Sequence, residues 1–457
     1  MIVAALVAGE LAAPTRPGAL TGPRQRGADP AAWAGPVGRL VATGLRGAEQ
    51  NDPVAAFYAR RGWRPLWTQG SQLRPEAAAV VAQLAAADDQ GLAAPDYLTP
   101  ALQSDLSAAR TRDPDRLARA EVGLSRAFAS YLADLRGRRT LDRLAFVDPG
   151  LRLDPIDAGV ILEQIAGARD LRHAIAAASM RSPPYETYRR AWLAERNRRG
   201  QEDLAQADWE RPVIAGLERL RAIPANPGPR YIVVDAASAQ LELWENGRVV
   251  DAMPVGVGKV QEPTPEMAGL IRYAVFRPYW NVPPDLTRDR IAPQVVAHGL
   301  AALQAQHLEV LSDWTDNAVP MDPAALDWAA VGTGSASLHL RQRPGPDNMM
   351  GKVKFMLPNP LGVYLHDTPL KALLKQTRRN VSAGCVRLSD ASRLTSRLLG
   401  DGAVPTGVDA EHKVDLSRPV PVFITYLTAA PGKTGFDARP DVYGRDPALL
   451  ARIGRSR

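Results

Sequence analysis

The hydrophobic residues of this chain change their spacing near residue 228, and this change limits the folds that it can adopt. Over residues 103–137 and 156–179, apolar residues recur every three or four positions, which is the spacing of amphipathic helices. After residue 228, the segments R-Y-I-V-V-D and A-Q-L-E-L-W-E-N-G-R-V-V alternate with the period of two that strands require. We therefore predict an α+β multidomain protein in which an α-helical N-terminal domain precedes a mostly-β domain.

Length and local composition set the predicted domain boundaries. At 457 residues the chain is too long for one ordinary hydrophobic core. We predict a helical domain over residues 50–180, a helical and polar connector over 181–228, and the β domain over 229–430. Residues 1–37 lack periodicity and are predicted to form a disordered leader or a signal segment, and residues 431–457 are predicted to form a C-terminal tail.

Two local features of the β domain lead to further predictions. The tripeptide Glu245-Asn246-Gly247 lies between two alternating segments and is predicted to turn a hairpin. The sequence pattern of residues 288–339 differs from that of the predicted strands around them, because I-A-P-Q-V-V-A and P-A-A-L-D-W-A-A-V are helical in character. Such an insertion in a β domain is typical of a lid over a site, so we predict a helical lid or capping insertion there.

Charge and hydropathy argue against two classes of partner. The net charge of +7 is spread along the chain, with arginine mixed among acidic residues throughout. No basic block with interleaved aromatic residues stands out, so we expect no nucleic-acid binding. No run reaches the roughly 18 uninterrupted apolar residues that a membrane-spanning helix needs, so we do not expect a transmembrane enzyme.

Cys385 is the only cysteine, which excludes an internal disulfide and a multi-thiolate metal site. A lone thiol is either a small buried hydrophobe or a reactive group. Here His366 lies nineteen positions earlier and can supply the base that a thiol needs for acyl transfer. Thr368-Pro369 can open a short helix with Asp367 or Thr368 as its cap, which would return the chain alongside itself. The two residues are therefore predicted to form a nucleophile and its general base and acid.

The residue before the cysteine is suited to stabilising an oxyanion. Acyl transfer places negative charge on a carbonyl oxygen, and backbone N–H groups can bind it where the chain turns tightly. Gly384 permits such a turn. We predict oxyanion donors among the N–H groups of Ala383, Gly384 and Cys385, with the last two forming the preferred pair.

Arg387 follows the cysteine by two positions, so on a strand it would face the same side as the thiol. It could hold a substrate carboxylate or lower the pKa of the thiol. Alternatively, it could brace the site through Asp367 or Asp390. These interpretations stay open from the sequence.

Metal binding is not supported by any pattern in the sequence. No H-E-x-x-H motif and no clustered Cys/His spacing appears, and the set of His339, His366 and Asp367 matches no zinc motif. The histidines other than His366 have no catalytic context. We therefore expect neither a metal nor an organic cofactor.

Two segments together resemble a known enzyme family. H-D-T-P at residues 366–369, followed by S-A-G-C-V-R-L at 382–388, resembles the catalytic signature of L,D-transpeptidases with a YkuD-type domain. The motifs V-G-V-G-K, P-Y-W-N-V-P and R-P-G-P-D-N-M-M-G-K-V-K-F-M-L-P-N extend the likeness over about 230–445. F-Y-x-R-x-G-W-x-P-x-W and G-L-x-x-x-D-Y resemble the helical scaffold domain of the large multidomain branch.

The resemblance implies a cysteine acyltransferase of peptidoglycan biosynthesis, with a role in cell-wall biogenesis and cell shape. Cys385 would attack the carbonyl of the diamino acid at position three of a tetrapeptide stem and release D-Ala. His366 would move the proton, with its ring oriented by Asp367. The side-chain amine of a second stem would then accept the acyl group and give a 3-3 cross-link. Donor and acceptor stems are the implied partners, together with cell-wall synthesis proteins.

Other readings of the same residues stay open. With water as the acceptor the enzyme would be an L,D-carboxypeptidase, and with other amines it would attach a protein or a noncanonical D-amino acid. A non-catalytic wall-binding scaffold is the alternative from another class. Two departures from the family pattern are visible: residues 183–228 are too short and too charged for a peptidoglycan-binding module, and Ala383 stands where relatives frequently carry His or Ser.

The first residues bear on localisation. Residues 1–13 contain an apolar run, but no Lys or Arg precedes it and Glu10 interrupts it, so it is an incomplete signal peptide. Either the true start lies upstream or these residues form an Ala-rich disordered end. We expect export to the periplasm, mainly because the implied substrate lies there.

Overall fold

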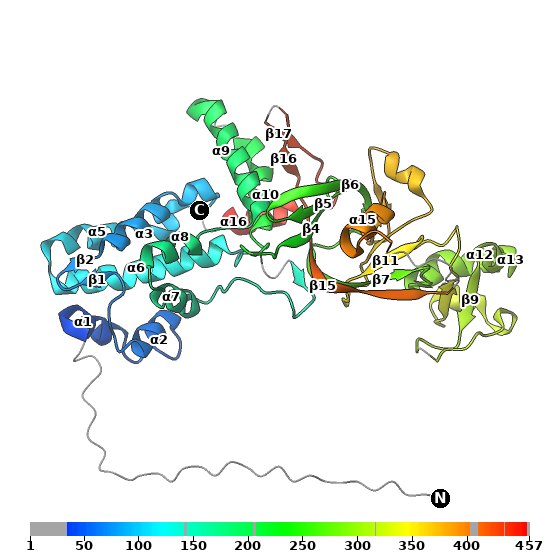
Figure 1. The fold of residues 1–457 in the computed structure, drawn as a ribbon, viewed down its shortest axis with the longest axis horizontal. Helices are drawn as coiled ribbons and strands as arrows, with labels where there is room; N and C mark the ends of the chain where they lie inside the picture. The colour runs from blue at the N-terminus through cyan, green and yellow to red at the C-terminus, as the bar shows by residue number, and fades with distance from the viewer. Residues whose placement is uncertain are drawn as a thin grey trace, which may run out of the picture.

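The computed structural model describes residues 34–454, apart from 141–143, 204–206, 316, 403–409 and 434. Figure 1 shows a helical body at one end, a sheet in the middle and a smaller mixed module at the other end. The predicted α+β multidomain class is therefore confirmed. The predicted leader lies almost entirely outside the described residues, and its last residues belong to the first helix, Gly35–Leu45.

The N-terminal body consists of helices whose starts are marked in the sequence. Asp52 and Asp113 each precede a proline, and each carboxylate accepts hydrogen bonds from two N–H groups of the first helical turn. The helices are α1 (Gly35–Leu45), α2 (Pro53–Arg60), α3 (Pro75–Ala85), α4 (Ala94–Tyr97), α5 (Pro100–Ala108), α6 (Pro114–Leu135), α7 (Ala158–Ala166) and α8 (Leu171–Ala178). The short strands β1 (Thr68–Gln69) and β2 (Gln72–Leu73) pair between α2 and α3.

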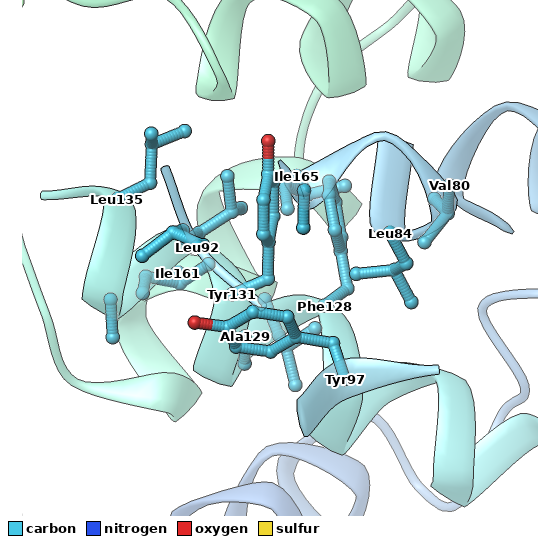
Figure 2. Packing of buried hydrophobic residues seen from close by; sticks show 14 of the residues in the cluster. Val80, Leu84, Leu92, Tyr97, Phe128, Ala129, Tyr131, Leu135, Ile161 and Ile165 are labelled. Carbon is cyan, nitrogen blue, oxygen red and sulfur yellow. The ribbon is translucent and has the colours of Figure 1, made fainter. Parts of the chain in front are cut away.

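Helix α6 is the centre of this body. Figure 2 shows Phe128 and Tyr131 of α6 packed among residues of α3 and α7, and their rings stack with centroids 6.3 Å apart. Glu121 on the same helix is fully buried, and it accepts hydrogen bonds from the Tyr58 hydroxyl and the Trp67 backbone. The aromatic motif of the sequence is thus held against α6 by a fully partnered carboxylate, which avoids the cost of an unpaired buried charge.

The segments predicted as connector and tail join this helical core, which differs from the prediction. Helices α9 (Pro183–Asp203) and α10 (Glu210–Leu220) contribute buried aromatic and aliphatic residues, and α16 (Asp446–Gly454) packs against α10. Arg219 of α10 forms a 2.7 Å ion pair with Asp446 of α16. Charged residues are frequent in these segments, so their sequence resembled that of a linker, although residues 213–220 of α10 are all buried.

The β domain closes into a barrel. Its strands follow the order β11-β12-β14-β6-β5-β4-β15-β7, and β11 also pairs with β7. The strands are β3 (Ala145–Phe146), β4 (Arg230–Asp235), β5 (Gln240–Glu245), β6 (Arg248–Gly258), β7 (Met267–Phe276), β11 (Val353–Met356), β12 (Leu365–His366), β13 (Asn380–Ser382), β14 (Val386–Leu388) and β15 (His412–Thr425). β3 extends the sheet from the helical body by pairing with β7, and β13 pairs with β6.

The predicted hairpin is confirmed between β5 and β6. Glu245 pairs with Arg248, so Asn246 and Gly247 form a two-residue loop. Both loop residues have positive φ, 49° and 78°, as a type I′ turn requires.

The inserted module, here called the cap, extends beyond the predicted boundaries of 288–339. It spans residues 280–342 and includes a three-stranded sheet of β8 (Trp280–Val282), β9 (Leu308–Leu311) and β10 (His339–Gln342). Its helices are α11 (Pro284–Leu286), η5 (Thr287–Ile291), α12 (Ala292–His298), α13 (Ala301–Ala305), η6 (Pro323–Ala325) and α14 (Trp328–Thr333), and it has a core of its own. The predicted insertion with helices is present, but its three strands were not predicted, because strands of three or four residues leave little periodicity in a sequence.

Three further elements follow the barrel strands: helix α15 (Ala391–Leu399), which packs against β15, and the paired strands β16 (Ala429–Pro431) and β17 (Phe436–Ala438). The latter pair lies in and next to the segment predicted as a tail. In the part of the chain that the structure describes, no helix combines the length and apolarity needed to cross a membrane.

Candidate functional site

Two parallel strands bring the predicted site residues together. In the pairing of β12 with β14, Leu365 lies opposite Val386 and His366 lies opposite Arg387. Leu365 and Val386 are fully buried in the barrel core. Because side chains alternate along a strand, His366 and Arg387 point to the other face. Cys385, immediately before β14, opens onto that same face.

This face forms one wall of a cavity of about 400 Å³, and the cap forms the opposite wall. The β domain contributes Tyr364, His366, Ser382, Ala383, Cys385, Arg387 and the loop residues Met349, Met350 and 360–362. The cap contributes Trp280, Asn281, Pro283, Asp285, Leu286 and Arg290. The cap therefore helps to shape the pocket in which the cysteine lies.

His366 is held in the form that can act as a base. Its Nδ1 lies 2.5 Å from the backbone carbonyl oxygen of Asp367, and a carbonyl can only accept, so Nδ1 carries the hydrogen. The lone pair of Nε2 is then free for proton transfer. Burial, followed by the positive charge of Arg387, lowers the pKa of His366 to about 4. The imidazole is therefore neutral near pH 7.

Asp367 orients the histidine through its backbone and not through its carboxylate. The carboxylate accepts a 2.8 Å hydrogen bond from the Lys352 N–H and forms a 2.5 Å ion pair with Lys371. The Lys371 ammonium also donates to the carbonyls of Leu388 and Ser389. The Asp367 side chain thus fixes the end of β14, while its carbonyl fixes the imidazole.

The predicted short helix after Asp367 is present, but it begins later. Thr368 accepts a hydrogen bond from the Leu370 N–H, and the helical turn η7 spans Lys371–Lys375. Pro369 therefore precedes the helix instead of opening it. This passage returns the chain alongside β12, as expected.

The thiol of Cys385 is protonated at rest. Burial raises the pKa of Cys385, against the opposing effects of the Tyr364 N–H and the Arg387 charge. Its Sγ donates to the Gly362 carbonyl at 3.5 Å. A protonated thiol that shares a cavity with a neutral imidazole needs its proton removed during attack, which is the task of a general base.

The turn that carries the cysteine is clamped by two hydroxyl groups. Gly384 has φ of +102°, a conformation that favours glycine. Thr264, fully buried, donates to the Gly384 carbonyl and accepts from the Gly258 N–H, each at 2.8 Å. Ser382 donates to the Cys385 carbonyl at 2.6 Å. This role of Thr264 was not predicted from the sequence, because Thr264 lies 120 positions before Gly384.

Thr264 also bears on the predicted oxyanion donors. In a trans peptide the C=O and the following N–H point in opposite directions. Because Thr264 binds the Gly384 carbonyl, the Cys385 N–H of the same peptide points away from Thr264. The Lys259 N–H likewise holds the Ser382 carbonyl at 3.0 Å and so fixes the plane of the Ala383 N–H.

We predict that Thr264→Val slows acylation about tenfold and lowers the free energy of unfolding by ~1–3 kcal/mol, because two buried backbone groups lose their partner. Thr395→Val is the matched control, since Thr395 is equally buried and bonds the Ala391 carbonyl within α15. Stopped-flow acylation rates and thermal melting measure both effects. An acylation rate that falls equally in both variants would refute the clamp.

The bracing interpretation of Arg387 does not match the geometry. Asp367 pairs with Lys371, and Asp390 caps α15 and faces Arg393. Within the described ranges, the buried Nε of Arg387 has no hydrogen-bond partner. The guanidinium instead lines the cavity.

His339, which was weighed as a partner of His366, lies in β10 of the cap. Its ring nitrogens face the Asp313 carbonyl and the Asn281 side chain, and the ring stacks on Trp314 with centroids 3.9 Å apart. His339 therefore stabilises the cap through these contacts.

Comparisons with known proteins agree with this architecture. Residues 229–436 match the family model of the L,D-transpeptidase catalytic domain, and residues 52–191 match that of the Scaffold domain. A Haemophilus influenzae protein that carries the name of an L,D-transpeptidase is 32% identical over 244 residues, which cover 52% of this chain and 48% of that protein. The chain thus spans about half the length of this relative.

Solved structures with similarity to the chain include two mycobacterial proteins. An L,D-transpeptidase from Mycobacterium smegmatis is 15% identical, with 43% of this chain and 58% of that chain covered and a TM-score of 0.22. L,D-transpeptidase 3 from Mycobacterium tuberculosis, in complex with a faropenem-derived adduct, is 16% identical, with 43% and 60% covered and a TM-score of 0.22.

Proposed function

Because residues 229–436 belong to the L,D-transpeptidase catalytic-domain family and follow a Scaffold domain, we propose that this protein is a cysteine acyltransferase that forms 3-3 cross-links between peptidoglycan tetrapeptide stems. One observation supports this most strongly. A neutral histidine with a fixed tautomer and a cysteine open onto one cavity from adjacent strands. This is the arrangement that nucleophilic acyl transfer needs.

In the first step, His366 Nε2 takes the thiol proton while Sγ of Cys385 attacks the carbonyl of the third stem residue. The C–S bond forms and negative charge develops on the carbonyl oxygen, where the N–H groups of the nucleophile turn can stabilise it. The tetrahedral species then collapses. The C–N bond to D-Ala breaks, and the imidazolium returns the proton to the leaving amine.

In the second step, the side-chain amine of another stem attacks the thioester. His366 accepts the amine proton and delivers it to the departing thiolate, which restores the thiol. Atoms and charge balance without a metal or cofactor. Water in place of the amine gives a tripeptide, so the L,D-carboxypeptidase alternative uses the same residues.

Product analysis tests this proposal. Wild-type protein incubated with disaccharide-tetrapeptide is expected to release D-Ala and to form cross-linked dimers detectable by mass spectrometry. Tripeptide without dimers would indicate a carboxypeptidase. No release of D-Ala under any condition would refute the enzymatic function and favour the non-catalytic scaffold.

The lowered pKa of His366 predicts the acid limb of the pH profile. Its folded-state value of about 4 lies below the ordinary 6.5, so the neutral base predominates above about pH 4 and is lost as pH falls through that value. We expect kcat/KM for D-Ala release to reach half its plateau near pH 4, with circular dichroism confirming the fold at each pH. A midpoint near 6.5 would contradict the buried, neutral histidine.

The substrate also sets the proposed localisation. Peptidoglycan stems are cross-linked outside the cytoplasm, so we propose that the protein acts in the periplasm, alongside cell-wall synthesis proteins. Fractionation of cells that express the full-length gene product tests this. Recovery only with cytoplasmic markers would contradict it.

A further inference from the structure

A second arginine faces Arg387 from the cap. Arg290 lies in η5 and lines the same cavity as Arg387 and Cys385. The two guanidinium groups are close enough for the charge of Arg290 to contribute to the lowered pKa of Arg387. Two like charges from different parts of the fold thus converge on one cavity.

Among the described residues, neither Arg387 nor Arg290 forms an ion pair with an acidic residue on the opposite wall of the cavity. Arg387 has a buried Nε without a partner among the described residues. A buried donor without an acceptor is costly, so such a group indicates a site for an acceptor that arrives with a ligand. Asp285 is the acidic residue of the cavity lining, and the two arginines outnumber it.

Arg290 has a partner that lies outside the cavity. Both carboxylate oxygens of Glu262 accept from one terminal nitrogen of Arg290, each at 2.8 Å. The Arg290 side chain is 45% exposed and the Glu262 side chain 26% exposed, so this pair is partly solvated and weak. The remaining guanidinium donors of Arg290 stay available to a second carboxylate.

Glu262 belongs to the loop between β6 and β7, two residues before Thr264. The Glu262–Arg290 pair therefore joins the cap to the loop that clamps the nucleophile turn.

We propose that Arg387 and Arg290 form a carboxylate subsite for the donor stem, and that Glu262 holds Arg290 in place until the stem binds. Arginine suits this role because its planar fork binds carboxylates with two hydrogen bonds. The inference rests on the proposed function, since it specifies the substrate group that the site selects.

Two carboxylates of the donor stem flank the bond that is cleaved, one on the diamino acid and one on the terminal D-Ala. Three stems separate these sources: the free acid, the form amidated at the diamino acid, and the form ending in D-alaninamide. Binding is measured by calorimetry in the Cys385→Ala variant, which cannot turn the stems over. Turnover by the wild type is measured separately, so failure of the proposed function remains distinguishable.

We expect one of the two amides to bind about tenfold or more weakly than the free acid. Adding Arg290→Gln to this variant should weaken binding of the free acid and leave binding of that amide nearly unchanged. The preference for the free acid over the amide then largely disappears. Glu262→Gln should preserve or increase the preference, because Arg290 then has no competing acid. Arg288→Gln is the matched control, since Arg288 lies in the same helix but pairs with Asp289.

If Arg290→Gln weakened the binding of all three stems equally, the proposed subsite would be overturned. A merely structural role of Arg290 would not depend on the charge of the substrate. Equal binding of the acid and both amides by the parent protein would also overturn it. Thermal melting of each variant shows whether the cap remains folded.

Discussion

Replacement of Cys385 by alanine is expected to abolish acylation, with D-Ala release from tetrapeptide stems falling by about 10⁴-fold or more. The methyl group offers no nucleophile, and no other cysteine exists in the chain to replace it. Cys385 is half-buried as a residue, and its thiol donates only a long, 3.5 Å hydrogen bond, to the Gly362 carbonyl. The free energy of unfolding should therefore change by less than about 1 kcal/mol.

Release of D-Ala by chromatography and unfolding by circular dichroism check this pair of expectations. Met349→Leu serves as a control, because Met349 lines the cavity but has no proposed chemical role. A mutant that is folded and still releases D-Ala at a measurable fraction of the wild-type rate would refute the assignment of the nucleophile.

Replacement of His366 by glutamine is expected to lower the acylation rate by about 10²–10⁴-fold, the usual contribution of a general base. Glutamine approximates the size of the ring and limits the cavity left at a fully buried position. The thiol pKa is raised, so the mutant must rely on the small thiolate fraction. Its rate should therefore increase with pH throughout the neutral range, whereas the wild-type rate is level there.

Pre-steady-state acylation measured from pH 5 to pH 9 distinguishes the two profiles. If the glutamine variant kept the wild-type rate and a level profile, another group would have to be the base, and the proposed proton path would be wrong.

The signature residues were predictable because the chemistry of acyl transfer restricts residue types strongly. The pair of His366 and Cys385 with Gly384 carried enough information to predict a dyad, and the β12–β14 pairing brings His366 and Cys385 to one cavity. The face shared with Arg387 also followed from strand alternation. These inferences needed only local geometry.

Other features depend on contacts between distant segments, which a single sequence does not display. The clamp by Thr264 acts across 120 positions on Gly384. Arg290 approaches Arg387 only because the cap folds over the barrel. Asp367 was predicted to orient His366, and it does so through its carbonyl, because its carboxylate binds Lys371 and the Lys352 N–H.

The types of secondary structure were predicted more accurately than the boundaries of the domains. Long amphipathic helices such as α6 and alternating strands such as β5 leave clear periods. The cap strands are too short for that, and α16 joins the helical core through only a few buried residues, including Leu449 and Ile453. The structure of these segments depends on tertiary packing and not on a local sequence pattern.

The identity of the acylated residue tests the central claim most directly. Wild-type protein mixed with a tetrapeptide stem and quenched rapidly is analysed by intact mass and by peptide mapping. We predict an added mass equal to the stem without its terminal D-Ala, located on the peptide that contains Cys385 and labile to hydroxylamine like a thioester. An adduct on another residue, or D-Ala release without any adduct, would contradict the account.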